Sequence, residues 1–219
     1  MDVDTRLQAV LDRISAAERS AGRASNSVDL VAVTKTFDAE HIRPALVAGH
    51  RIFGENRVQE SQGKWPALKQ EFPDVQLHLI GPLQSNKSAD AVALFDVIHT
   101  IDREKIAKTI AEECRKQGRT LQFYVQVNTG LEEQKAGVSP DQLVDFVAVC
   151  RDTYELDIVG LMCIPPFDEN PGPHFALLRN LAEQADVDKL SMGMSGDFET
   201  AIEFGSTSVR IGSAIFGNR

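Results

Sequence analysis

Residues 28–36, VDLVAVTKT, end an apolar run with a lysine. Five of the six residues from 28 to 33 are aliphatic or small, which predicts a strand buried on both faces, as in a parallel sheet. Lys35 at the end of such a strand is costly to bury unless its ammonium is paired, neutralised or used chemically. Three roles stay open: a salt bridge to a carboxylate such as Glu55 or a side chain that reaches water, a clamp for phosphate or carboxylate, and a nucleophilic amine able to form a Schiff base with a carbonyl.

A second group of candidates lies near the C-terminus. Residues 194–197, MSGD, precede a predicted helix, where the hydroxyl of Ser195 and backbone N–H groups provide a seat for phosphate. Arg210, Gly212 and Ser213 follow at the next strand end, and Gly212 allows close approach of a ligand to the backbone. The alternative is that these glycines only shape turns. A phosphate seat opposite an amine suits a ligand with phosphate at one end and a carbonyl at the other, such as pyridoxal 5′-phosphate or a phosphosugar.

The elements that must position these residues alternate between strand and helix. After an N-terminal helix over 4–22, apolar runs predict eight strands, over 28–35, 51–55, 75–81, 96–101, 121–129, 157–164, 189–194 and 207–212. Helical patterns lie between them, at Arg103–Lys116, Asp141–Tyr154, Pro173–Ala185 and Asp197–Phe204 among others. Eight such units favour an α/β fold, a closed (β/α)8 barrel in one domain over 1–219, with residues 1–24 forming an extra helix packed on the barrel. Function in such barrels lies at the C-terminal strand ends, where Lys35, Asn56 and the tail segments fall.

The composition excludes several classes of protein. The 219 residues carry a net charge of −9, which opposes general binding to nucleic acid or anionic membranes. No segment is as long and apolar as a membrane span, and the N-terminus lacks the pattern of a signal peptide. Three widely spaced cysteines and five histidines without metal-ligand spacing argue against a disulfide framework or a metal site. We therefore expect a metal-free protein in the cytoplasm.

Several long motifs, in order from about residue 28 to the last residue, resemble those of the pyridoxal phosphate homeostasis proteins. These are single-domain relatives of the N-terminal barrel of alanine racemase. The motifs are AVTK (32–35), FGENRVQE (53–60), HLIGPLQSNK (78–87), QVNTG with EEQKAGV (126–138), GLMCIP (160–165), LSMGMSGDFETAI (190–202) and GSTSVRIGSAIFG (205–217).

The resemblance implies a (β/α)8 barrel of the alanine racemase N-terminal type that holds pyridoxal phosphate as an internal aldimine. It implies that Lys35 is the Schiff-base lysine and that Arg210 faces the pyridine nitrogen. Ser195, with the amides of Gly212 and Ser213, would hold the phosphate. Asn56 would lie beside the ring.

Physical chemistry limits the activity expected of such a site. An arginine beside the pyridine nitrogen disfavours its protonation, which leaves the cofactor a weaker electron sink than a carboxylate partner would. Racemisation needs a base on each face of the ligand, and Lys35 can supply one of them. A tyrosine is the candidate for the other, but the sequence has only Tyr124, predicted inside a strand, and Tyr154, predicted at a helix end. We therefore expect a monomeric protein that buffers pyridoxal phosphate, and delivers it to apo-enzymes, without efficient turnover. The alternatives are a minimal amino-acid racemase and a Schiff-base aldolase acting on a phosphosugar.

Overall fold

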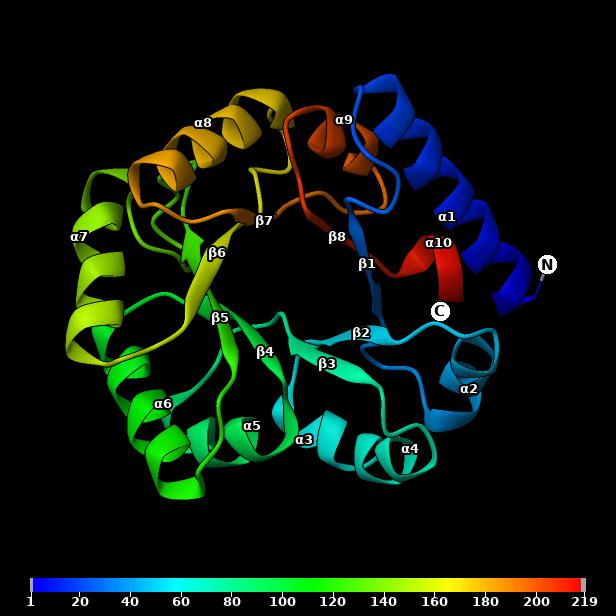
Figure 1. Cartoon of the computed structure of the whole chain (residues 1–219), viewed down its shortest axis with the longest axis horizontal. Coiled ribbons are helices and arrows are strands. Elements are labelled where there is room, and N and C mark those ends of the chain that lie inside the picture. Colours follow the sequence, from blue (N-terminus) through cyan, green and yellow to red (C-terminus); the bar gives the residue numbers. More distant parts are fainter. Residues whose placement is uncertain (1, 218–219) are drawn as a thin grey trace.

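Eight parallel strands close into a barrel in chain order, and helices surround it (Figure 1). The computed structural model describes residues 2–217. The strands are β1 (Asp29–Val33), β2 (Ile52–Glu55), β3 (Gln76–Leu79), β4 (Val97–Ile101), β5 (Gln122–Val127), β6 (Ile158–Cys163), β7 (Lys189–Ser191) and β8 (Ser208–Ile211). The barrel closes where β1 pairs with β8, with Ala32 opposite Ile211. The predicted (β/α)8 barrel is thus confirmed. Strands β2 and β4 end at the predicted residues, and the other six end one to three residues earlier than the sequence indicates.

The helices alternate with the strands on the outside of the barrel. They are α1 (Val3–Ser20), α2 (Ala39–Val47), α3 (Val58–Gln62), α4 (Trp65–Glu71), α5 (Ser88–Leu94), α6 (Glu104–Gln117), α7 (Leu143–Ala148), α8 (Pro171–Gln184), α9 (Phe198–Glu203) and α10 (Ser213–Phe216). Short 3-10 turns occur at η1 (Ser85–Lys87) and η2 (Pro140–Gln142), and η3 (Val149–Thr153) is a π-helix. The continuous helix predicted over 141–154 is therefore divided among three helix types.

Helix α1 lies along the outside of the barrel, beside α10 (Figure 1). Its buried stripe includes Leu7, Val10 and Ile14, and it packs against α2, α9 and α10. The buried carboxylate of Glu18 accepts a hydrogen bond from the backbone N–H of Val28 at 2.9 Å. This bond fixes the end of α1 to the residues that lead into β1. That residues 1–219 act as one domain stays a prediction.

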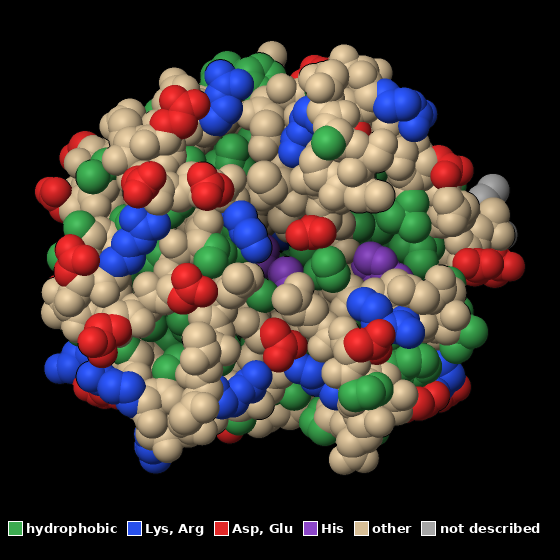
Figure 2. All heavy atoms as spheres, viewed as in Figure 1, with side chains coloured by type: hydrophobic (Ala, Val, Ile, Leu, Met, Phe, Trp, Pro, Cys, Tyr) green, Lys and Arg blue, Asp and Glu red, His purple; other side chains and the backbone are tan. Residues whose placement is uncertain are grey.

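Most of the apolar core lies between the strands and the surrounding helices. A smaller cluster, separate from this core, consists of Val97 on β4, Tyr124 on β5 and Met162 on β6. Next to it, His78 Nδ1 and His99 Nε2 lie 2.9 Å apart, and the ring of His99 stacks on Tyr124 with centroids 4.3 Å apart. His78 is thus a buried, hydrogen-bonded residue of the barrel. Histidine side chains are visible in the hollow at the middle of the face drawn in Figure 2.

None of the helices within residues 2–217 combines the length and the apolar composition that crossing a bilayer would need.

We expect the two buried histidines to make folding sensitive to acid. Burial lowers the pKa of His78 to about 3 and that of His99 well below its usual value, with Lys189 and Arg210 adding to the effect and Asp96 opposing it at His78. Below about pH 6.5 the unfolded chain therefore binds protons that the folded chain does not. Their stabilising contribution is complete above that pH and falls by about 1.4 kcal/mol per pH unit for each histidine as the pH drops toward the folded pKa.

Urea unfolding at several pH values between 5 and 6.5 measures this slope. The variant His78→Gln should lower it by about one proton, and an NMR titration of the wild-type rings should show neither histidine titrating above pH 5. An equal slope in both proteins would contradict the assignment.

Candidate functional site

Lys35 lies beyond the end of β1, in a turn, and its side chain is exposed. The expectation of a buried ammonium is therefore wrong, because the strand ends at Val33 and the chain has turned toward solvent two residues later. The alternative salt bridge to Glu55 is also wrong. Glu55 is fully buried and its Oε1 lies 2.8 Å from Lys64 Nζ. Within residues 2–217, the ammonium of Lys35 makes no hydrogen bond and no salt bridge.

Hydrogen bonds from the segment after β2 stabilise the turn that carries Lys35. Lys64 Nζ donates to the carbonyl oxygens of Thr34 at 2.9 Å and Phe37 at 2.8 Å. The carboxylate of Glu60 accepts from the backbone N–H of Thr36. Thr36 has φ +72°, a strained conformation for a β-branched residue, which persists only where neighbours impose it. The backbone on both sides of Lys35 is thus fixed while its amine stays free.

Arg210 carries a buried charge without a carboxylate partner. It lies on β8 and is 5% exposed. Its guanidinium donates to Ser191 Oγ at 2.6 Å and to the carbonyl oxygen of Cys163 at 2.8 Å, and no salt bridge reaches it from the described residues. Desolvation lowers its pKa, opposed by Cys163, Asp197 and Tyr124. Since Cys163 and Ser191 are the last residues of β6 and β7, the guanidinium lies at the C-terminal end of the barrel.

Two hydroxyl groups meet where the loops after β7 and β8 approach each other. Ser213 Oγ and Ser195 Oγ are 3.3 Å apart. Ser213 begins the short helix α10, whose first N–H groups have no acceptor within the helix. A Cβ on Gly212 would lie 3.1 Å from the carbonyl oxygen of Val33, so the absence of a side chain lets β8 continue close beside β1. Ser195 was predicted at a helix N-terminus, but α9 begins only at Phe198, so the turn and not the helix places its hydroxyl.

Asn56 follows β2 and is half-buried. Its backbone packs so closely on Gly81 that a Cβ there would lie 2.2 Å from the Asn56 carbonyl oxygen, and this contact fixes the residue. Asn56 lines a cavity of about 580 Å³ together with Arg57, Lys87 and Arg103. The structure thus places Lys35, Asn56, Ser195, Arg210, Gly212 and Ser213 at one end of the barrel, with Asn56 on the opposite side of β1 from the serines.

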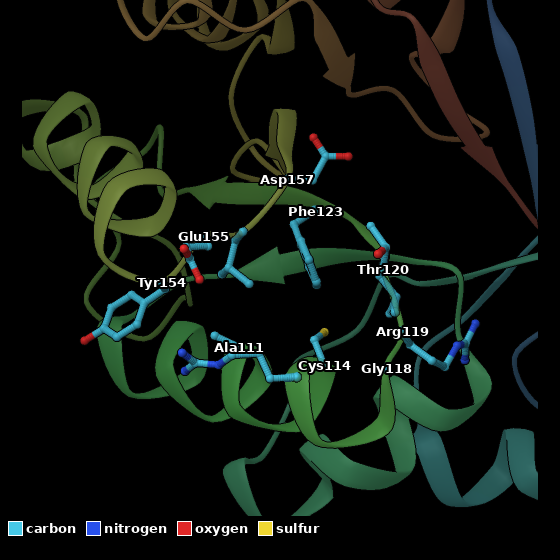
Figure 3. Close-up of a pocket in the computed structure, with 12 residues that line it drawn as sticks. Ala111, Cys114, Gly118, Arg119, Thr120, Phe123, Tyr154, Glu155 and Asp157 are labelled. Carbon is cyan, nitrogen blue, oxygen red and sulfur yellow. The ribbon is translucent and has the colours of Figure 1, made fainter.

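A smaller pocket of about 420 Å³ lies at the other end of the barrel, between α6 and the starts of β5 and β6 (Figure 3). Cys114, Phe123 and Tyr154 line it, and the hydroxyl of Tyr154 donates to Glu104 at 2.7 Å. Burial raises the pKa of the Cys114 thiol, which lowers its reactivity. In barrels of this kind the residues at this N-terminal end contribute to stability, whereas active sites lie at the C-terminal end of the strands.

Sequence reasoning missed the residues that hold the candidates. These are Lys64, which holds the turn around Lys35, and Ser191, which holds Arg210. Both act through contacts with residues distant in the sequence, so spacing gives no signal for them. The only sequence signal is their position, since Ser191 lies inside the motif over 190–202 and Lys64 lies four residues after the motif over 53–60.

These residues share one end of the barrel, and their chemistry suits an anionic ligand. Lys35 offers an unpaired amine, Arg210 a buried donor group, and the two serines a small donor cluster suited to phosphate. An amine of this kind can condense with an aldehyde, with loss of water. The donor set therefore fits pyridoxal phosphate, which has an aldehyde, a ring nitrogen acceptor and a phosphate.

Comparison with known proteins agrees with this chemistry. Residues 6–219 match the family model for the alanine racemase N-terminal domain. A pyridoxal phosphate homeostasis protein of Vibrio cholerae is 42% identical, over 99% of this chain and 96% of that protein. A solved structure of an unknown protein from Bifidobacterium adolescentis has a TM-score of 0.92 and 34% identity, over 97% of this chain and 94% of the other.

PipY of Synechococcus elongatus, solved with pyridoxal phosphate bound, has a TM-score of 0.84 and 35% identity, over 99% of this chain and all of that one. The similarity to the homeostasis protein of Vibrio cholerae thus spans nearly the whole of both chains. The chain belongs to the pyridoxal phosphate homeostasis protein family, on the barrel fold of the alanine racemase N-terminal domain.

Proposed function

We propose that this protein binds pyridoxal phosphate reversibly, buffers the free aldehyde in the cell and passes it to apo-enzymes. The observation that carries the proposal is the buried guanidinium of Arg210, which has no carboxylate partner among the described residues and lies at the same end of the barrel as the free amine of Lys35. A buried charge of this kind needs a polar ligand to offset its desolvation. The names of the relatives and the ligand of PipY support the same choice.

Six residues would hold the ligand. Lys35 would bond covalently to its aldehyde carbon as a Schiff base, and Arg210 would donate to the ring nitrogen. Ser195, Gly212 and Ser213 would hold the phosphate, and Asn56 would lie beside the ring. Bound in this way, pyridoxal phosphate supplies an electrophilic carbon and a modest electron sink.

We also propose that the chain works as a monomer in the cytoplasm. Cys114, Cys150 and Cys163 are all free thiols, as is usual in a reducing compartment. We propose in addition that it has no efficient catalytic activity. Tyr124 is buried in β5 against His99, and Tyr154 lies at the opposite end of the barrel, so neither tyrosine can act as a second base facing Lys35.

The covalent bond can be tested by reduction. Borohydride treatment of the protein with pyridoxal phosphate should leave a pyridoxyl adduct on Lys35, mapped by mass spectrometry. Lys35→Ala should carry no adduct and should bind the ligand about tenfold more weakly or worse, since the covalent bond is lost. Lys108→Ala, which changes an exposed lysine on α6, is the matched control and should behave as wild type. Undiminished affinity and an aldimine absorption band in Lys35→Ala would overturn the covalent assignment.

The phosphate seat can be tested by charge alone. Ser195→Asp places a carboxylate where the phosphate would bind, whereas Ser195→Asn is neutral and of the same size. Repulsion at this range should weaken binding of pyridoxal phosphate by about tenfold or more relative to the Asn variant. Binding of pyridoxal, which lacks the phosphate, should differ little between the two variants. Equal losses for both ligands would place the phosphate elsewhere.

The alternative of a minimal racemase makes a different prediction. With L-alanine in deuterated water, the loaded protein should form α-deuterated D-alanine no faster than free pyridoxal phosphate at the same concentration, because inversion needs a second base opposite Lys35 and neither tyrosine lies there. Chiral chromatography with mass spectrometry measures the D-alanine and its deuterium. Rapid formation of D-alanine that disappears in Lys35→Ala would establish the racemase instead.

A further inference from the structure

A chain of hydrogen bonds crosses the inside of the barrel and ends at Arg210. Arg210 donates to Ser191 Oγ at 2.6 Å, and Ser191 Oγ lies 2.9 Å from His99 Nδ1. His99 Nε2 lies 2.9 Å from His78 Nδ1, and His78 Nε2 lies 3.1 Å from the side-chain oxygen of Gln76. The chain thus links β8, β7, β4 and β3, from the C-terminal end of the barrel to the first residue of β3. Ser191 and His99 are fully buried, so water cannot replace these contacts.

The arginine and the hydroxyl of Ser191 together set the direction of the bonds in this chain. A guanidinium can only donate, so Ser191 Oγ accepts from Arg210, and the hydroxyl hydrogen then needs an acceptor of its own. Among the described contacts of Ser191 Oγ, His99 Nδ1 is the group that can accept it. His99 then carries its proton on Nε2 and donates to His78, which carries its proton on Nε2 in turn and donates to Gln76. In the reverse arrangement the hydroxyl hydrogen of Ser191 would have no acceptor in a fully buried place, which is unfavourable. One polarity therefore satisfies every group.

The same chain leaves part of the guanidinium available. Two of the five N–H groups that an arginine carries are directed to Ser191 and Cys163, and the others have no acceptor within residues 2–217. Both acceptors are neutral, and the two histidines must also stay neutral because each has one ring nitrogen acting as an acceptor. The positive charge of Arg210 is therefore fixed in place but not neutralised.

We propose that Ser191 and His99 are positioning residues for Arg210, holding its free N–H groups toward the ring nitrogen of the bound cofactor and keeping that nitrogen an unprotonated acceptor. His78 and Gln76 complete the chain by fixing the tautomer of His99. Tyr124, stacked on His99 at 4.3 Å between ring centroids, fixes its plane. The inference rests on the proposed function, since the ligand is the one proposed there.

The polarity can be tested without any ligand. Nitrogen-15 NMR of the protein, labelled at histidine, should show His78 and His99 as neutral rings protonated on Nε2. In Ser191→Ala the hydrogen bond to His99 Nδ1 is lost, so the His99 signals should move, whereas Ser208→Ala should leave them unchanged. Ser208 is the matched control because it is buried on the same strand as Arg210 and its hydroxyl has no partner among the described residues. Rings protonated on Nδ1, or a charged His99, would overturn the chain.

The positioning role can be tested with two ligands. Pyridoxal phosphate has a ring nitrogen, and its 1-deaza analogue has a C–H group in that place. The wild-type protein should prefer pyridoxal phosphate, and Ser191→Ala should reduce this preference about fivefold or more, as expected for one hydrogen bond. Ser208→Ala should keep the preference, and Ser191→Thr, which restores the hydroxyl, should recover most of it.

The outcomes separate this inference from the proposed function. An unchanged preference in Ser191→Ala, or an equal loss for both ligands, would overturn the positioning role while leaving cofactor binding intact. A wild-type protein that bound neither compound would overturn the proposed function and the ligand assigned to this chain together.

Discussion

The buried guanidinium of Arg210 is the constraint around which the interior of this barrel is arranged. Removing a charge from water costs free energy, and inside proteins the cost is usually offset by an opposite charge. Here the partners are a hydroxyl, a backbone carbonyl oxygen and, through the hydroxyl, two neutral histidines. These dipoles orient the guanidinium without cancelling its charge. The remaining field is directed to the C-terminal end of the barrel, where the free amine and the serine hydroxyls also lie.

The two cations of the site are held by different means, and each suits a different task. Arg210 lies deep in the barrel and is fixed by its acceptors. Lys35 is exposed, and only the backbone around it is fixed, by Lys64 and Glu60. Glu55 draws Lys64 into the protein, although burial raises the pKa of that carboxyl. An exposed amine on a turn that its neighbours fix is accessible to a ligand, while a donor held in place suits the recognition of a single atom.

The strands and the end of the barrel that carries the site could be predicted from the sequence, because apolar runs and turn residues are local patterns. Lys35, Ser195 and Arg210 could be singled out because their residue types follow such runs. The pairing of Glu55 with Lys64 could not be predicted. From the sequence, Lys35 at the neighbouring strand end is an equally good partner for Glu55, and only the packing of the segment that leads into α4 brings Lys64 to that carboxylate. The contact between His99 and Ser191 joins residues 92 positions apart, so only barrel closure creates it.

The partner that we propose for the ring nitrogen, Arg210, would favour binding of the cofactor over its activation. A carboxylate would stabilise a protonated ring nitrogen and so strengthen the cofactor as an electron sink. A guanidinium held by neutral groups does the reverse, because a second positive charge beside it is unfavourable. The same arrangement would still bind the unprotonated ring, because its nitrogen can accept a hydrogen bond from the guanidinium. Binding and activation of the cofactor are therefore separable, and this barrel has the features that favour binding.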